Sequence, residues 1–185
     1  MRKLITLLDR ANHRVGRAVM WLAVAMAVIQ FATVVLRYVF AVGFIPVQES
    51  IWYLNGVLFM LGAGFTLMTD GHVRVDIFYR EASDRRRALT DFLGSVVLLI
   101  PVCLAVLVFS WRYVIGSWRV LEGSTEVSGL PFVFLLKTVI WAFAVLLLMQ
   151  AVALALRAWL MLSGASAGYS AAAERAVRKD GASPP

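Results

Sequence analysis

Four long apolar stretches dominate the chain and are separated by short polar segments. They cover about residues 18–36, 51–69, 92–111 and 132–156. Each offers roughly 19 or more residues with almost no charge, which is the length that an α-helix needs to cross the ~30 Å hydrocarbon core of a bilayer. Because backbone N–H and C=O groups find no water there, each stretch must be helical. The pattern predicts an all-α integral membrane protein with four transmembrane helices.

The segment before the first span has a different pattern. Apolar residues recur at helical spacing and arginines occupy the other faces, with Leu4, Leu8, Ala11 and Val15 against Arg10, Arg14 and Arg17. This pattern predicts an amphipathic helix that lies in the plane of the lipid headgroups before the first span begins. Together with the four spans it makes a membrane domain over residues 1–162. The remaining residues, 163–185, are rich in Ala, Ser, Gly and Pro and are predicted to be a disordered tail.

The composition agrees with a membrane protein. Apolar residues make up 61% of the chain and charged residues 16%, well outside the usual values for soluble proteins. The single cysteine, Cys103, falls within the third span, so neither an intrachain disulfide nor a thiolate metal cluster is expected. We interpret Cys103 as a small packing residue.

The lysines and arginines lie mainly on one side of the predicted membrane. Five precede the first span, five lie between the second and third spans and four follow the fourth, against one and two in the other loops. The positive-inside rule then places both termini in the cytoplasm of a multi-pass inner-membrane protein. We attribute the net charge of +7 to this topology and to anionic membrane lipids. No loop is long enough to fold a basic domain, so no nucleic-acid partner is expected.

The predicted spans carry polar side chains but no charge near their middles. The uncharged polar residues there are Gln30, Thr33, Asn55, Thr66, Ser95 and Gln150. Proton and ion pathways normally require ionisable groups at this depth. Both histidines fall outside the spans, so haem ligation is not expected, and a lone histidine among arginines makes a poor metal site. No phosphate-binding loop is present. The sequence therefore predicts neither catalytic, cofactor-binding nor metal-binding residues, and we do not expect an enzyme.

Two ionisable features need separate interpretations. The stretch "TDGHVRVDIFYREASDRRR", residues 69–87, is densely charged, but each of its acids has a cation close by in sequence, which favours a self-neutralised loop. Lys137 lies about two turns into the fourth span, where its side chain can reach towards the nearer membrane surface. It can also pair with Glu49 at the outer end of the second span. These two roles for Lys137 remain alternatives.

One run of residues resembles a known family. It extends from Gln48-Glu49-Ser50 through Trp52-Tyr53 and Gly62-Ala63-Gly64 to Gly71-His72-Val73-Arg74-Val75-Asp76. This run is similar to the small membrane subunit of tripartite ATP-independent periplasmic (TRAP) transporters, and the basic N-terminal helix, the four spans and the charge asymmetry also fit. The resemblance implies a family motif and subunit interface formed by Glu49, Trp52, Tyr53, Gly62, Gly64, Gly71, His72, Arg74 and Asp76.

The resemblance also implies a division of labour between three proteins. A periplasmic solute-binding protein captures an organic acid, usually a carboxylate, and a large permease subunit moves it inward with sodium. The small subunit is a scaffold for the large one. The 69–87 stretch then becomes a cytoplasmic helix end and inter-subunit contact, where His72 can hydrogen-bond at the end of the second helix. A loop that only enforces topology remains the alternative.

Two other classes of function remain open at this point. A membrane-anchor subunit of a respiratory or other inner-membrane enzyme complex would require haem-ligating histidines within the spans. A small self-sufficient exporter would require a membrane-embedded carboxylate, for which Glu49 is the candidate. The depth and partners of Glu49 therefore distinguish the exporter from the scaffold.

Overall fold

The computed structural model describes residues 2–72 and 83–163, and these ranges are helical with short connections. The helices are α1 (Arg2–Val39), α2 (Ile45–Met68), α4 (Asp84–Leu93), the π-helix η1 (Gly94–Leu99), α5 (Ile100–Arg119) and α6 (Val133–Leu162). Within the described ranges, four helices are long and apolar enough to cross a membrane. The predicted all-α class with four spans is confirmed. Arg74, Asp76 and the tail beyond residue 163 lie outside the described residues.

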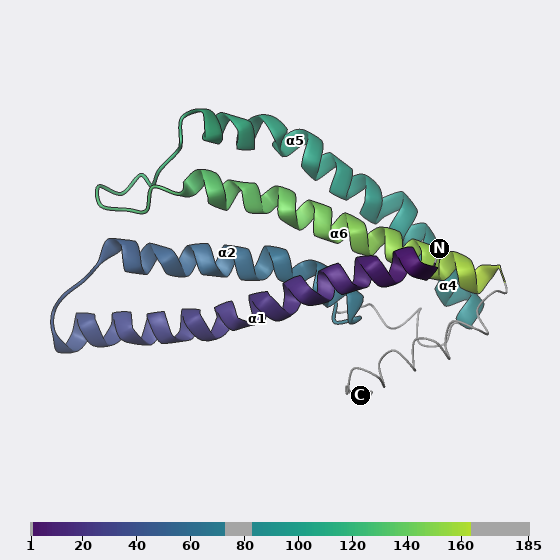
Figure 1. The fold of residues 1–185 in the computed structure, drawn as a ribbon, viewed down its shortest axis with the longest axis horizontal. Helices are drawn as coiled ribbons and strands as arrows, with labels where there is room; N and C mark the ends of the chain where they lie inside the picture. Colours follow the sequence, from purple (N-terminus) through teal and green to yellow (C-terminus); the bar gives the residue numbers. More distant parts are fainter. Residues whose placement is uncertain (1, 73–82, 164–185) are drawn as a thin grey trace.

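Two antiparallel hairpins form the bundle. Helices α1 and α2 make the first, and α5 and α6 make the second (Figure 1). Helix α6 lies between α5 and the first hairpin and contacts every other helix. Small buried residues on α6 allow this close packing: Ala144, Ala151, Ala153, Ala155 and Ala158.

The amphipathic N-terminal segment is not separated from the first span. Helix α1 runs without a break from Arg2 to Val39. Its buried positions are Ile5, Asn12, Gly16 and Val19, while Leu4 is 47% exposed. The predicted apolar stripe is therefore displaced by about one residue, because α1 packs against α2 and α6.

The third span also extends beyond its apolar window. Helices α4, η1 and α5 form one continuous helical segment over Asp84–Arg119. Pro101 is the second residue after the π-helical turn and lacks the N–H that an α-helix would use at that position. A wider π turn relieves the clash between the proline ring and the carbonyl of Val97, four residues earlier. The irregular turn thus lets the helix continue through the proline.

Tryptophan–hydroxyl pairs join α5 to α6. The Trp118 Nε1–H donates to Thr138 Oγ1 over 2.8 Å, and the Trp141 Nε1–H donates to Ser110 Oγ over 3.1 Å. Trp141 also stacks on Trp111 with ring centroids 4.7 Å apart. Indole rings supply a large packing surface, and their N–H groups need an acceptor where water is excluded. These pairs fix the register of the second hairpin.

Candidate functional site

The motif residues on α2 divide between two faces of the helix. Glu49 and Gly64 are buried, and Tyr53 is half-buried beside the α5–α6 loop. Trp52 is 67% exposed, and a Cβ built on Gly62 would have no neighbouring atom within 4 Å. The inward face therefore holds this chain together, and the outward face is free to meet another molecule.

The buried Glu49 carboxylate holds the loop of residues 120–132, which joins α5 to α6. The Ser124 hydroxyl donates to Oε1, and the Leu130 backbone N–H donates to Oε2 over 2.6 Å. One turn further along α2, the Tyr53 hydroxyl donates to the Leu130 carbonyl over 3.5 Å. Hydrogen bonds to a charged acceptor are stronger than neutral ones. Glu49 thus fastens the first hairpin to the second.

Gly129 completes this arrangement. A Cβ at that position would lie 2.7 Å from Glu49 Oε2 and would overlap the Ser124 side chain. A larger residue would therefore push the loop away from the carboxylate. Within the loop, Ser124 N–H donates to the Leu130 carbonyl over 3.0 Å and draws its two ends together. The loop is shaped around Glu49.

The expected pair between Glu49 and Lys137 is not formed. Lys137 makes an ion pair with Glu122, which follows the end of α5, and its ammonium lies 4.0 Å from the Tyr113 ring centroid. The Glu49 oxygens are already used by the loop, and Glu122 is the carboxylate that faces Lys137 from the adjacent helix end. Hydrogen bonding from Lys137 lowers the pKa of Glu122. Lys137 therefore pairs with Glu122, and the Glu49 partner that the sequence analysis named was wrong.

The end of α2 is closed by Gly71 and not by His72. Asp70 adopts a left-handed conformation with φ 59°, and the Gly71 N–H donates to the Thr66 carbonyl over 2.9 Å. This six-residue closure is a Schellman motif, which satisfies a free carbonyl at the helix end. His72 is exposed and makes no hydrogen bond with the described residues. The predicted hydrogen bond from His72 is therefore absent, because backbone groups supply it.

A buried polar junction near the N-terminal end of α1 was missed by the sequence analysis. Asn12 Nδ2 donates to Gln150 Oε1 over 3.1 Å and to the Leu146 carbonyl over 3.3 Å. Gln150 Nε2 lies 3.4 Å from Asp9 Oδ1, and Asp9 also forms an ion pair with Arg157. Asn12 and Gln150 are each 1% exposed. An available signal was Gln150 itself, an amide inside an apolar span that needs a partner.

Gly64 places α2 at this junction, in addition to α1 and α6. A Cβ at Gly64 would overlap Asn12 Oδ1 and would lie 3.3 Å from the Leu146 carbonyl. Asn12 Oδ1 accepts no conventional hydrogen bond in the described structure. It lies directly against Gly64. Helices α1, α2 and α6 therefore meet at a point where only glycine fits on α2.

The polar side chains of these sites link parts of the same chain. The buried side chains of Asn12, Gln150 and Glu49 each bond one helix to another helix or to a loop. In residues 2–72 and 83–163, no group of three or more His, Cys, Asp or Glu side chains lies close enough to hold a metal ion. The fold and its polar contacts define an integral membrane protein built as a helical framework.

Comparison with known proteins supplies the family. The family described as tripartite ATP-independent periplasmic transporters, DctQ component, matches residues 26–161. The chain belongs to this family, as the resemblance of the α2 motif indicated. A relative from Vibrio cholerae serotype O1, the C4-dicarboxylate TRAP transporter small permease protein DctQ, is 32% identical over 101 residues. This match covers 51% of the present chain and 38% of the relative. No solved structure matches the chain.

The two α2 glycines provide a matched pair of substitutions. Gly64→Ala is expected to destabilise the chain by about 1–3 kcal/mol, because the added methyl group overpacks the junction with Asn12. Gly62→Ala is expected to leave stability unchanged or to raise it by up to about 1 kcal/mol, since its Cβ would enter open space and alanine favours the helix. Thermal unfolding of the purified full chain in detergent measures both. A smaller loss from Gly64→Ala in an Asn12→Ala background would locate the clash, and equal effects of the two glycine substitutions would contradict it.

Removing the Glu49 carboxylate should release the α5–α6 loop. In Glu49→Ala, amide hydrogen exchange in peptides containing Leu130 is expected to rise about tenfold or more, because a charge-assisted hydrogen bond is lost. Gln48→Ala is the matched control, since Gln48 is exposed and the hydrogen bonds from α2 to that loop come from Glu49 and Tyr53. Unchanged exchange in Glu49→Ala would show that the carboxylate does not hold the loop.

Proposed function

We propose that this chain is the small permease subunit of a TRAP transporter and that it scaffolds the large permease subunit. The large subunit would carry the sodium-driven uptake of an organic acid delivered by a periplasmic binding protein. Membership of the DctQ-component family supports the subunit assignment. The name of the Vibrio cholerae relative, a C4-dicarboxylate small permease protein, supports a carboxylate as the transported solute.

The proposal of a scaffold rests on the bonding of the buried polar side chains in the helices. Asn12, Gln150 and Glu49 are buried and are engaged with other parts of the same chain. Glu49 was the candidate carboxylate for an independent exporter, but its two oxygens hold a loop at the end of the bundle. Groups committed to such contacts are poorly placed to bind and release an ion during a transport cycle. A scaffold agrees better with this arrangement than an exporter does.

The outward face of α2 is the surface that we assign to the large subunit. Trp52, Asn55, Phe59 and Gly62 follow one another at three- or four-residue spacing on this face, and the first three are exposed. The Asn55 side chain makes no hydrogen bond within the described residues, and an unsatisfied amide is costly in hydrocarbon. A partner helix can supply the missing bonds, and Gly62 allows its backbone to approach closely. A protein partner suits this face better than lipid tails do.

The end of the family motif would form a second contact. Gly71 and His72 are exposed at the end of α2, and the motif continues with Arg74 and Asp76. We assign these four residues to the cytoplasmic side of the same interface. A loop that serves only topology would tolerate His72→Ala with no loss of subunit association, whereas our assignment requires a loss.

The bundle is consistent with the orientation that the charge count predicts. The start of α1, the end of α2 and the end of α6 lie towards the same end of the bundle (Figure 1). We assign this end of the bundle to the cytoplasm of an inner-membrane protein, because the basic segments of the sequence attach to it. Labelling of Asp84→Cys by an impermeant reagent in intact cells, with Cys103 replaced, would contradict this orientation.

Blocking the outward face should separate the two permease subunits. Gly62→Leu is expected to reduce co-purification with the large subunit at least fivefold, because the larger side chain keeps the partner helix away. Gly116→Leu on α5 is the matched control, since a Cβ at Gly116 also meets no atom within 4 Å. Thermal unfolding of each variant alone checks that the chain still folds. Equal co-purification of both variants would exclude this face as the interface.

A further inference from the structure

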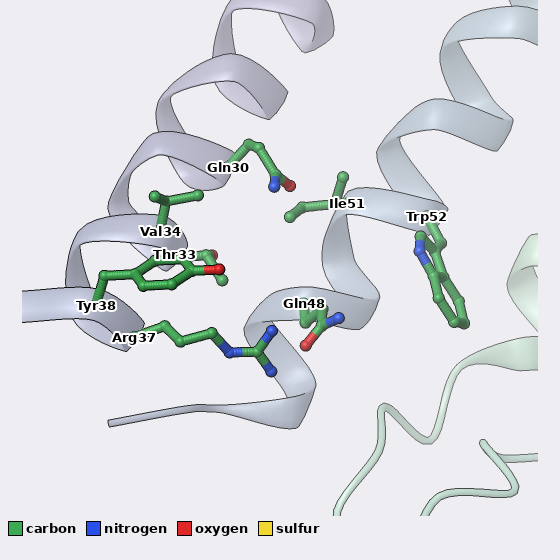
Figure 2. A pocket seen from close by; sticks show the side chains of 8 residues that line it. All are labelled: Gln30, Thr33, Val34, Arg37, Tyr38, Gln48, Ile51 and Trp52. Atoms are coloured by element: carbon green, nitrogen blue, oxygen red, sulfur yellow. The ribbon is translucent and has the colours of Figure 1, made fainter. Parts of the chain in front are cut away.

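A polar cleft lies between the end of α1 and the start of α2. Its volume is about 340 Å³, and its lining includes Gln30, Thr33, Arg37, Gln48 and Trp52. Figure 2 shows the Arg37 guanidinium reaching across the cleft towards Gln48, with Gln30 further along α1. The volume falls within the range of about 300–1,000 Å³ that is typical of small-molecule sites. None of the lining residues belongs to the polar contacts that hold the bundle together.

The charge in this cleft is uncompensated. No acidic side chain lines it, and Arg37 forms no ion pair with the described residues. The adjacent N-terminus of α2 has no capping side chain and no acid in its first turn. A helix N-terminus carries partial positive charge and favours anions. Arg37 and the Gln48 carboxamide therefore offer donors to an anionic ligand in the cleft.

The surroundings of the cleft identify the kind of anion. Tyr38 is 80% exposed and Trp52 67% exposed, at the end of the helices where aromatic side chains usually meet lipid headgroups. Nearer the middle of α1, Ala23 and Ala27 are exposed and continue the face that carries Gln30 and Arg37. A ligand at Arg37 would thus have its charge among polar groups and its remainder along an apolar helix face. That is the shape of a phospholipid.

We propose that this cleft binds the headgroup of a phospholipid, with the phosphate at Arg37 and Gln48. The Gln30 carboxamide lies about two helical turns deeper and is placed to bond glycerol or ester oxygens. The absence of a carboxylate from the lining favours a headgroup with net negative charge, because the ammonium of a zwitterionic lipid would find no ionic partner. The cleft lies beside the outward face of α2, but this proposal does not depend on the large subunit.

Native mass spectrometry of the full chain in detergent micelles tests the site, with phosphatidylglycerol as the probe. We expect a bound lipid on the wild-type chain and about tenfold weaker retention in Arg37→Gln, since one charged hydrogen-bonding partner is lost. Arg119→Gln is the matched control, because Arg119 is also an exposed arginine in the last turn of a helix. Equal losses in the two variants would overturn the site, because they would mean that any surface arginine holds the lipid.

Four further measurements make the result specific. Circular dichroism checks that Arg37→Gln keeps its helices, and Gln48→Leu, which leaves the charge in place, is expected to weaken lipid retention several-fold. Wild-type retention in a folded Gln48→Leu would contradict the geometry proposed here.

Soluble glycerol 3-phosphate at the same concentration should not displace the lipid, and displacement would show that the site takes a free phosphate ester. Phosphatidylethanolamine should be retained less than phosphatidylglycerol, and the reverse order would contradict the charge argument.

Discussion

The exclusion of water from the bilayer is the constraint on which this structure depends. Polar groups inside the helices must find partners within the protein, since an unpaired group costs several kcal/mol there. The chain meets this requirement at three places. Glu49 binds the loop between α5 and α6, Asn12 and Gln150 join α1 to α6, and the indoles of Trp118 and Trp141 bond hydroxyls across the second hairpin. The few buried polar side chains therefore determine how the apolar helices are arranged.

The helices themselves were predictable from the sequence. Hydrocarbon thickness sets the length of an apolar span, so hydropathy alone located all four. The parts of the helices outside the apolar windows were harder to predict, because a helix can continue without an apolar pattern. Helix α1 does so from Arg2 and α4 from Asp84. The π-helical turn before Pro101 depends on local backbone packing that periodicity does not report.

The partners of the polar residues were harder to predict. Glu49 and Lys137 were recognised as significant, but spacing along the chain does not show which residues face them across the bundle. The loop that binds Glu49 is more than 70 positions away in sequence, and Lys137 uses Glu122 instead. Asn12 was missed because its segment was interpreted as a lipid-facing amphipathic helix. Its burial depends on Gly64, a contact between two helices that only the folded structure reveals.

The family motif on α2 has two separate tasks in this account. Its inward residues hold the chain together, and its outward residues are assigned to a partner.

The central claim is that the chain supports transport without performing it. Reconstitution in liposomes with a sodium gradient tests this claim, using a carboxylate that the binding protein retains. The full chain alone should accumulate no solute, while the chain with the large subunit and the binding protein should accumulate it. Sodium-driven uptake by this chain alone would contradict the account.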